Sequence, residues 1–179
     1  MALLIMCQLS LILLLSKSQI NGLLAELGTL YMGVWSAPPW CEQWSHFNAC
    51  AEITALAEKM EAMIFAAVAS EKVIGFCASY EMTAGELAKK TSLSLCLPAG
   101  RILYLAEMLV GAENRGQGVG VSLTLATITA AKTAGYGSVV LRTDIDAIPA
   151  RKLYAKMGFC DTGISDVDHS TRTYWVLTL

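Results

Sequence analysis

Apolar residues in the first third of the chain recur with the period of a helix. In the segment that follows Ser18 they stand three and four residues apart, at Leu23, Leu24, Leu27 and Leu30. This spacing predicts an amphipathic helix that Ser18 caps. We expect it to end before Pro38 and Pro39, because a proline pair does not continue a helix. A second helix, rich in Ala and Glu, is predicted over 47–60.

Strands are indicated where apolar residues follow one another without a break. The runs 62–69 and 72–82 are joined by two residues only, which predicts a β-hairpin. The segment 83–100 contains Gly and Pro and is predicted to be a loop that carries a short helix. A strand over 101–110 then leads through a glycine-rich segment into a helix over about 119–134.

The last third of the chain repeats this alternation. A continuous apolar run over 138–143 is typical of a strand covered on both faces. A short helix over 149–157, which Gly158 ends, and a strand over 173–179 complete the chain. The order of elements predicts an α/β (α+β) fold, with helices around a mixed sheet. We expect residues 1–179 to form a single domain.

The amino-terminal run 1–15 is almost wholly apolar. We expect a buried first strand over about 8–15. A signal or membrane-surface segment, or a misassigned start, is the alternative. The run is shorter than the roughly 18–20 residues that span a bilayer. The first lysine, Lys17, comes after the run, and no small-residue cleavage site follows it. A membrane partner is therefore not expected.

Composition narrows the class of protein. Of the chain, 55% is apolar and 16% is charged, with a formal net charge of −2, which excludes intrinsic disorder and gives nucleic-acid binding no electrostatic support. The six cysteines are far apart and form no CxxC pair, so we expect no metal site and a reducing, cytoplasmic location. The low charge content leaves room for a surface that forms a homodimer.

The most informative segment joins the strand 101–110 to the helix that follows. Three glycines, Gly116, Gly118 and Gly120, stand at the predicted helix start. Unpaired N–H groups and the helix dipole make such a junction a place for an anionic group. A P-loop would need Gly-Lys-Ser/Thr here and a dinucleotide fold GxGxxG, and neither is present. A glycine-rich turn without a ligand is the remaining alternative.

Residues 115–120 read R-x-x-G-x-G and resemble the pyrophosphate-binding signature of the GNAT superfamily of N-acetyltransferases. A second GNAT-like motif, AxxLYxKxGF, covers 150–159. The resemblance is strong over 101–160 and weaker over the hairpin. Residues 36–44, SAPPWCEQW, are similar to a segment of the branch that includes aminoglycoside-type acetyltransferases.

This resemblance implies a mostly antiparallel central sheet in which two parallel strands splay apart around acetyl-CoA. The strand would offer backbone groups to the pantetheine arm, and the amides of the glycine loop would hold the pyrophosphate. The residues expected to bind the cosubstrate are Met108, Leu109, Val110, Arg115, Gly116, Gln117, Gly118, Val119 and Gly120.

The resemblance also implies direct attack of an amine on the thioester. Tyr154 matches the tyrosine that protonates the coenzyme A sulfur in many GNAT members, although it also lies on an apolar helix stripe and could be core. Glu107 stands beside the expected acetyl position and could take the ammonium proton through water or attract a cationic substrate. A solvated or paired surface glutamate is the alternative for Glu107.

Other candidates are expected to have supporting roles. Asp144 and Asp146 follow a strand and are expected in a turn, and His46 and His169 are expected to be structural or exposed. Trp40 and Trp44 could line an acceptor pocket or anchor a helix. Many GNAT members carry Asn seven residues before the tyrosine, where this chain has Ala147, so that coenzyme contact is not expected.

The sequence therefore predicts an acetyl-CoA-dependent N-acetyltransferase that acts on a primary amine of a small molecule or a peptide. The alternatives are a non-catalytic acyl-CoA-binding module of the same fold, a protein N-terminal acetyltransferase, and an exported or membrane-associated protein. The predicted acceptor loops, 31–48, 83–100 and 161–172, contain no motif that names the amine.

Overall fold

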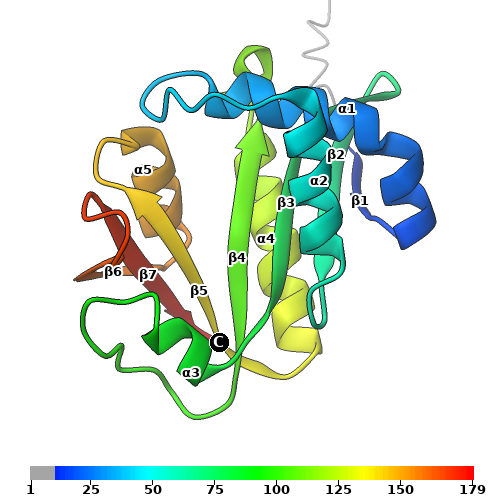
Figure 1. Cartoon of the computed structure of the whole chain (residues 1–179). Coiled ribbons are helices and arrows are strands. Elements are labelled where there is room, and N and C mark those ends of the chain that lie inside the picture. The colour runs from blue at the N-terminus through cyan, green and yellow to red at the C-terminus, as the bar shows by residue number, and fades with distance from the viewer. Residues whose placement is uncertain (1–10) are drawn as a thin grey trace, which may run out of the picture.

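A mixed sheet of seven strands is the centre of the fold in the computed structural model, which describes residues 11–179. The strand order is β1-β2-β3-β4-β5-β7-β6, and every neighbouring pair is antiparallel except β4 and β5. Helices α1 and α2 lie in front of the sheet and α4 lies behind it (Figure 1). The predicted α/β (α+β) fold with a mostly antiparallel sheet is confirmed.

The strands are β1 (Leu11–Leu14), β2 (Met63–Ala69), β3 (Lys72–Met82), β4 (Arg101–Val110), β5 (Tyr136–Asp144), β6 (Cys160–Ser165) and β7 (Arg172–Thr178). The helices are α1 (Lys17–Trp35), α2 (His46–Ala57), α3 (Ala84–Ala88), α4 (Val119–Thr133) and α5 (Ile148–Lys156). A 3-10 turn, η1 (Ala112–Asn114), precedes α4. The predicted hairpin, the strand 101–110 and the short helix within 83–100 are thus confirmed.

The first helix begins earlier than the sequence predicts. Ser16, and not Ser18, is its N-cap, because Ser16 forms a capping box in which its side chain and that of Gln19 each accept the other's backbone N–H. The helix ends at Trp35, before the two prolines, as expected. The predicted acceptor loop 31–48 is therefore wrong at both ends, since 31–35 belong to α1 and 46–48 to α2. The predicted first strand is observed from Leu11, and its residues 8–10 lie outside the described part of the chain. The strand lies at the edge of the sheet with Leu11 and Leu14 exposed, so the expectation that it is buried is wrong. Between residues 11 and 179, no helix is long and apolar enough to cross a bilayer.

The carboxyl-terminal region contains a strand that the sequence does not predict. Strand β6 overlaps the stretch 161–172 that is predicted to be an acceptor loop, so that expectation is wrong for residues 161–165. Its sequence, CDTGIS, is mostly polar and carries a glycine at φ 67°, which hides the strand pattern. It is an edge strand that pairs with β7 on one side and with no other strand of the sheet on its other side.

Two main apolar layers hold the helices against the sheet. Leu27 of α1 and Ile53 of α2 pack with Phe76 of β3 on one face, and all three side chains are fully buried. Leu123 of α4 packs with Val139 of β5 on the opposite face. The layer under α4 includes residues of both β4 and β5. On the other face a third cluster, with Tyr104 of β4 and Val140 of β5, covers the same two strands. The core therefore fixes the two parallel strands from both sides.

Candidate active site

The parallel strands β4 and β5 separate part of the way along their length. Their pairing begins at Arg101 and Tyr136 and ends with the pair Leu105–Leu141. Beyond this pair β4 continues to Val110 and β5 to Asp144 without being paired to each other. The splayed parallel strands implied by the family resemblance are therefore present. Unpaired strand edges leave backbone N–H and C=O groups free for a ligand.

A bulge in β4 determines which face Glu107 occupies. Ala78 of β3 is opposite Glu107, but the next residue, Ser79, is opposite Leu105, so Ala106 is an extra residue. Side chains alternate between faces along a strand, and an extra residue reverses that alternation. Tyr104 and Glu107 consequently share the face that α1 and α2 cover. Without the bulge Glu107 would point toward α4.

The backbone of β4 offers alternate groups to the opening. The Gly111 amide donates to the Ile74 carbonyl of β3 at 2.9 Å. Hydrogen-bonding direction alternates along an antiparallel strand, so the Leu109 amide also faces β3. The amides and carbonyls of Met108 and Val110 therefore face the opening. All three predicted cofactor-binding residues are in register with β3, and Leu109 is the one whose N–H and C=O point toward β3 rather than toward the opening.

The glycine loop forms an uncapped helix start. Gly116 and Gly118 have φ of 75° and 85°, a left-handed conformation that favours glycine, and Gly118 is the N-cap of α4. No side chain caps this helix, and its first internal bond runs from the Ser122 amide to the Gly118 carbonyl at 3.0 Å. The preceding amides have no partner within the helix. A diphosphate is suited to them because it is an anion with several acceptor oxygens.

Gly120 has a different role from the two other glycines. A Cβ atom at this position would lie 3.2 Å from Cδ2 of Leu153 on α5. No atom lies within 4 Å of the corresponding positions at Gly116 and Gly118. Gly120 therefore allows α4 and α5 to approach each other, whereas Gly116 and Gly118 shape the loop.

A groove of about 550 Å³ runs from the glycine loop toward the opening. The predicted cofactor-binding residues that line it are Met108, Val110, Arg115, Gly116, Gly118, Val119 and Gly120. Gln117 is not among its lining residues, and its side chain donates to the Glu113 carbonyl at 2.9 Å. Arg115 is partly occupied with the loop itself, since its Nε donates to the Val110 carbonyl at 3.2 Å.

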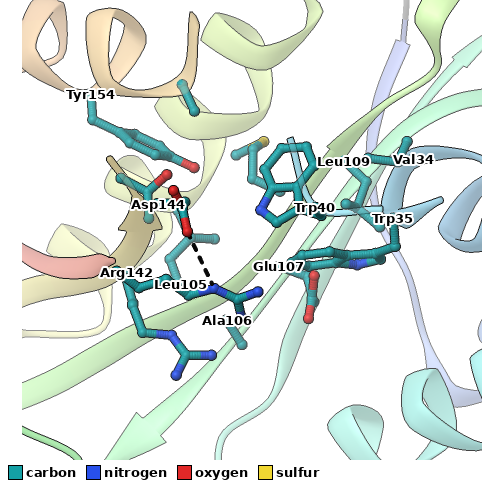
Figure 2. Close-up of a pocket in the computed structure, with 14 residues that line it drawn as sticks. Val34, Trp35, Trp40, Leu105, Ala106, Glu107, Leu109, Arg142, Asp144 and Tyr154 are labelled. Atoms are coloured by element: carbon teal, nitrogen blue, oxygen red, sulfur yellow. Dashed lines mark ion pairs between the residues drawn. The ribbon is translucent and has the colours of Figure 1, made fainter. Parts of the chain in front are cut away.

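A second, smaller cavity of about 90 Å³ adjoins this groove (Figure 2). Tyr154, Trp40 and Met108 line both spaces, whereas Glu107 lines the smaller one. The two sites predicted for acid and base chemistry are thus brought to one cavity from α5 and from β4. This arrangement places a proton donor where the spaces meet and a carboxyl group deeper in the smaller cavity.

Tyr154 is buried in the apolar layer, with its ring edge-on to Phe159 at 5.7 Å. It is a core residue, and it also lines the cavity, so its place in the core does not remove it from the site. Its role as an acid stays a prediction. Burial raises the pKa of its phenol above the usual value, followed by smaller contributions from Cys77 and Glu107. The hydroxyl therefore stays protonated at neutral pH and is available as a donor.

The carboxyl group of Glu107 is withdrawn from solvent. Its Oε1 accepts a hydrogen bond from the Tyr31 hydroxyl at 3.4 Å, and its Oε2 is buried with no hydrogen-bond partner among the described residues. Burial raises the pKa of this carboxyl to about 8, and the negative charge of Glu52 adds to the effect. The alternative of a solvated or ion-paired surface glutamate is therefore wrong. A carboxyl that titrates near pH 8 suits proton transfer with an amine.

Two arginines also line the smaller cavity, and each is held by an acidic side chain. Arg142 donates to Asp166 at 2.6 Å, and Arg172 donates to Glu42 at 2.7 Å. Asp144 accepts from the backbone N–H of Asp146 at 3.0 Å. The turn role predicted for Asp144 is therefore confirmed, although Asp144 also lines the cavity.

The remaining candidates have separate roles. Trp40 lines both cavities, whereas Trp44 packs edge-on against Tyr31 with 4.8 Å between ring centroids. His46 is structural, since its Nε2 lies 2.9 Å from the Ala25 carbonyl oxygen. The exposed His169 donates its backbone N–H to Asp166.

Four residues of the smaller cavity and its wall were not singled out from the sequence: Tyr31, Trp35, Arg142 and Arg172. Tyr31, Trp35 and Arg172 do fall within the predicted acceptor segments 31–48 and 161–172, whereas Arg142 lies outside them. Tyr31 and Trp35 lie in a helix whose apolar pattern predicts only core packing. Arg142 and Arg172 lie on strands β5 and β7, two residues out of direct register and on one face. Arg142 lies in the run LRTD at 141–144, which is part of the family resemblance, but nothing local relates it to Arg172. The pairing of β5 with β7 brings the two together.

The chain matches the Acetyltransferase (GNAT) family over residues 27–159, which is most of its length, and it therefore belongs to this family. Human N-acetyltransferase 8 is 26% identical over 143 residues, covering 76% of this chain and 58% of that protein. N-alpha-acetyltransferase 30 of Schizosaccharomyces pombe is 37% identical over 57 residues, covering 32% of this chain and 38% of that protein. The matches thus span between about a third and three fifths of these relatives.

Solved structures show the same fold at low identity. A Pyrococcus horikoshii protein, PH1933, has a TM-score of 0.73 at 18% identity and covers 96% of this chain and 99% of that one. An aminoglycoside 6'-acetyltransferase type Ii has a TM-score of 0.69 at 16% identity, covering 94% and 96%. A chain of the NatC complex bound to Gag peptide and CoA has 0.68 at 15%, covering 95% and 98%. At such identities the likeness shows the fold and does not select the aminoglycoside branch.

Proposed function

We propose that this GNAT acetyltransferase moves an acetyl group from acetyl-CoA to a primary amine, which attacks the thioester directly. The observation that carries the proposal is the meeting of two spaces at Tyr154. One is a groove that begins at an uncapped glycine loop, and the other is a small cavity that contains a buried carboxyl group. A cosubstrate with a diphosphate at one end and a reactive thioester at the other fits this layout.

The cosubstrate would be held mainly by the backbone. The free amides at the start of α4, between Gly118 and Val121, would bind the diphosphate. The Met108 amide and carbonyl and the Val110 amide, which face the opening, would bind the pantetheine arm and hold the thioester carbonyl, while the Val110 carbonyl accepts from Arg115. Positioning the thioester beside the acceptor amine would supply much of the rate enhancement, because it removes the need for a chance encounter.

Glu107 would act as the base. An amine arrives as an ammonium ion at neutral pH and must lose a proton before its nitrogen can attack. The Glu107 carboxylate would accept that proton, directly or through one water molecule. The nitrogen then bonds to the thioester carbon, and the oxyanion that forms is stabilised by strand amides.

Tyr154 would act as the acid. When the tetrahedral intermediate collapses, the C–S bond breaks and its electron pair goes to sulfur. The Tyr154 phenol would give its proton to this sulfur, and the second proton of the amine nitrogen restores the phenol. The products are an amide and coenzyme A in its thiol form, with one proton left on Glu107 for release to solvent.

A thiol-release assay with acetyl-CoA and a panel of primary amines tests this proposal. Tyr154→Phe should lower kcat about 10²-fold or more while the Kd for coenzyme A changes little. Tyr136→Phe, at the far end of β5, is the matched control and should keep the wild-type kcat. If Tyr154→Phe has the same kcat as wild type, the assignment of Tyr154 as the acid is wrong.

Acetylation of a peptide α-amine is a second candidate function. The similarity to N-alpha-acetyltransferase 30 over 57 residues favours it. The same assay should therefore include short peptides with free amino termini beside small amines. A higher kcat/KM for peptides would favour this second function. Coenzyme binding without thiol release from any amine or peptide would instead indicate a non-catalytic acyl-CoA-binding module.

A further inference from the structure

The two oxygens of the Glu107 carboxyl group have unequal surroundings. Oε1 accepts the hydrogen bond from Tyr31, with 3.4 Å between the oxygens. Oε2 is buried and has no partner among the described residues, although the side chain lines the small cavity. A buried carboxyl oxygen without a hydrogen bond is costly, so its partner is expected to be supplied by a bound molecule.

Tyr31 is fixed in place by the aromatic residues around it. Its side chain is buried between Trp44, at 4.8 Å, and Trp35, at 6.0 Å between ring centroids. Trp44 is itself anchored, since its Nε1 donates to Glu42 at 3.0 Å. A ring held on two sides presents its hydroxyl in one direction. Burial also raises the pKa of the Tyr31 phenol, so the group stays a donor.

We propose that Tyr31 is a positioning residue for the base: its phenol holds Oε1 of Glu107 and leaves Oε2 to take the proton of the acceptor amine. This inference rests on the proposed function, since it assigns different roles to the two oxygens of the Glu107 carboxyl group, which is the proposed base. Tyr31 touches neither the amine nor the thioester in this scheme. It acts by orienting Glu107 and by favouring the ionised carboxylate through a hydrogen bond.

Other titratable and charged groups lie around Glu107, and some of them favour or disfavour its ionised carboxylate. Those that face it, or line the same cavity, come from every element packed against it: Tyr31 of α1, Glu52 of α2, Tyr80 of β3, Tyr104 of β4, Arg142 and Asp144 of β5, Tyr154 of α5 and Arg172 of β7. Glu52 disfavours the carboxylate and Arg142 favours it. The indole N–H of Trp35 also faces Glu107 and, like the Tyr31 phenol, favours the carboxylate. Of these two donors, Tyr31 is the one within hydrogen-bond distance, because Nε1 of Trp35 has no hydrogen-bond partner among the described residues.

The pH dependence of kcat/KM separates this role from a structural one. We compare each variant with wild type at each pH as a ratio, because the ionisation of the amine substrate then cancels. Tyr31→Phe removes the donor and should move the apparent pKa of the base upward by roughly 0.5–1 pH unit. The ratio should therefore fall to about 0.1–0.3 at pH 7 and recover toward 1 near pH 10.

Two further variants provide the controls. Tyr104→Phe removes a buried hydroxyl from the same face of the sheet, and its ratio should not vary with pH. Glu52→Gln removes a negative charge and should move the profile to lower pH. A ratio for Tyr31→Phe that is constant from pH 6 to pH 10 would overturn the inference.

A double variant distinguishes failure of this inference from failure of the proposed function. If Tyr31 acts through Glu107, Tyr31→Phe should not change the residual rate of Glu107→Gln, whereas a purely structural role would lower both rates alike. If Glu107→Gln is as active as wild type, the proposed base is wrong and the inference fails with it. Should Tyr31→Phe not fold, a fluorotyrosine at position 31 retains the ring and donates more strongly. It should then move the profile to lower pH, and an unmoved profile would overturn the inference.

Discussion

Replacing the buried carboxyl group with an amide should stabilise the protein at high pH. In the folded state the pKa of Glu107 is raised from its usual value of 4.5 to about 8. The folded state therefore holds this proton more tightly than the unfolded chain does. Between pH 4.5 and pH 8 the wild-type free energy of unfolding should fall as the pH rises, because folding then requires the proton to be retained or a charge to be buried.

The magnitude follows from the difference between the two pKa values. Each pKa unit corresponds to about 1.4 kcal/mol, so the full effect approaches about 5 kcal/mol above pH 8 and is about 3 kcal/mol at pH 7. These are upper values, because the side chain of Glu107 also borders a cavity where water can relieve part of the cost. Glu107→Gln carries no charge at any pH and does not pay this penalty.

Urea unfolding of wild type and Glu107→Gln at pH 5, 7 and 9 measures the effect. The two proteins should have similar free energies of unfolding at pH 5, and the variant should become more stable by a few kcal/mol at pH 9. Glu113→Gln changes an exposed glutamate and should show no such trend. If the difference between wild type and Glu107→Gln does not grow with pH, the carboxyl group is solvated and the proposed base loses its physical basis.

Three other outcomes are expected. Asp166→Asn should lower the free energy of unfolding by about 3 kcal/mol at pH 7, because Arg142 and Tyr174 then lose the carboxylate that they contact. The pKa of Asp166 is lowered in the folded state, so the difference between wild type and variant in urea unfolding should become smaller in acid. Gly118→Ala should cost about 1–2 kcal/mol in the same measurement, because its φ is left-handed. Cys77 is fully buried and its thiol pKa is raised to about 11, so mass spectrometry should find it unalkylated in native protein while the exposed Cys160 reacts.

The sequence predicts the parts of this protein that depend on local pattern. The hairpin, the strand 101–110 and the helix that follows it are each marked by a continuous or periodic apolar run. The glycine loop is also local, since Gly116 and Gly118 are needed for a backbone conformation that they alone adopt easily. The family motif over 150–159 also predicts that Tyr154 lies on a short helix.

Features that depend on register are not visible in the sequence. The bulge at Ala106, which turns Glu107 toward α1 and α2, changes one pairing between β3 and β4 and carries no composition signal. Arg142 and Arg172 meet only because β5 pairs with β7. The same holds for Tyr31, which contacts Glu107 across 76 positions of sequence. The wall of the small cavity therefore depends on tertiary pairing that the sequence does not reveal, whereas the glycine loop is determined by local sequence.

Binding of acetyl-CoA is the most direct measurement of the central claim, and isothermal titration calorimetry on the full chain provides it. Wild type should bind one equivalent of acetyl-CoA in a saturable manner. Uptake by Gly120→Val should be much weaker, because a side chain at this position, at the start of α4, would meet Leu153 of α5 and displace the helix start. Absence of saturable binding to folded wild type would contradict the account.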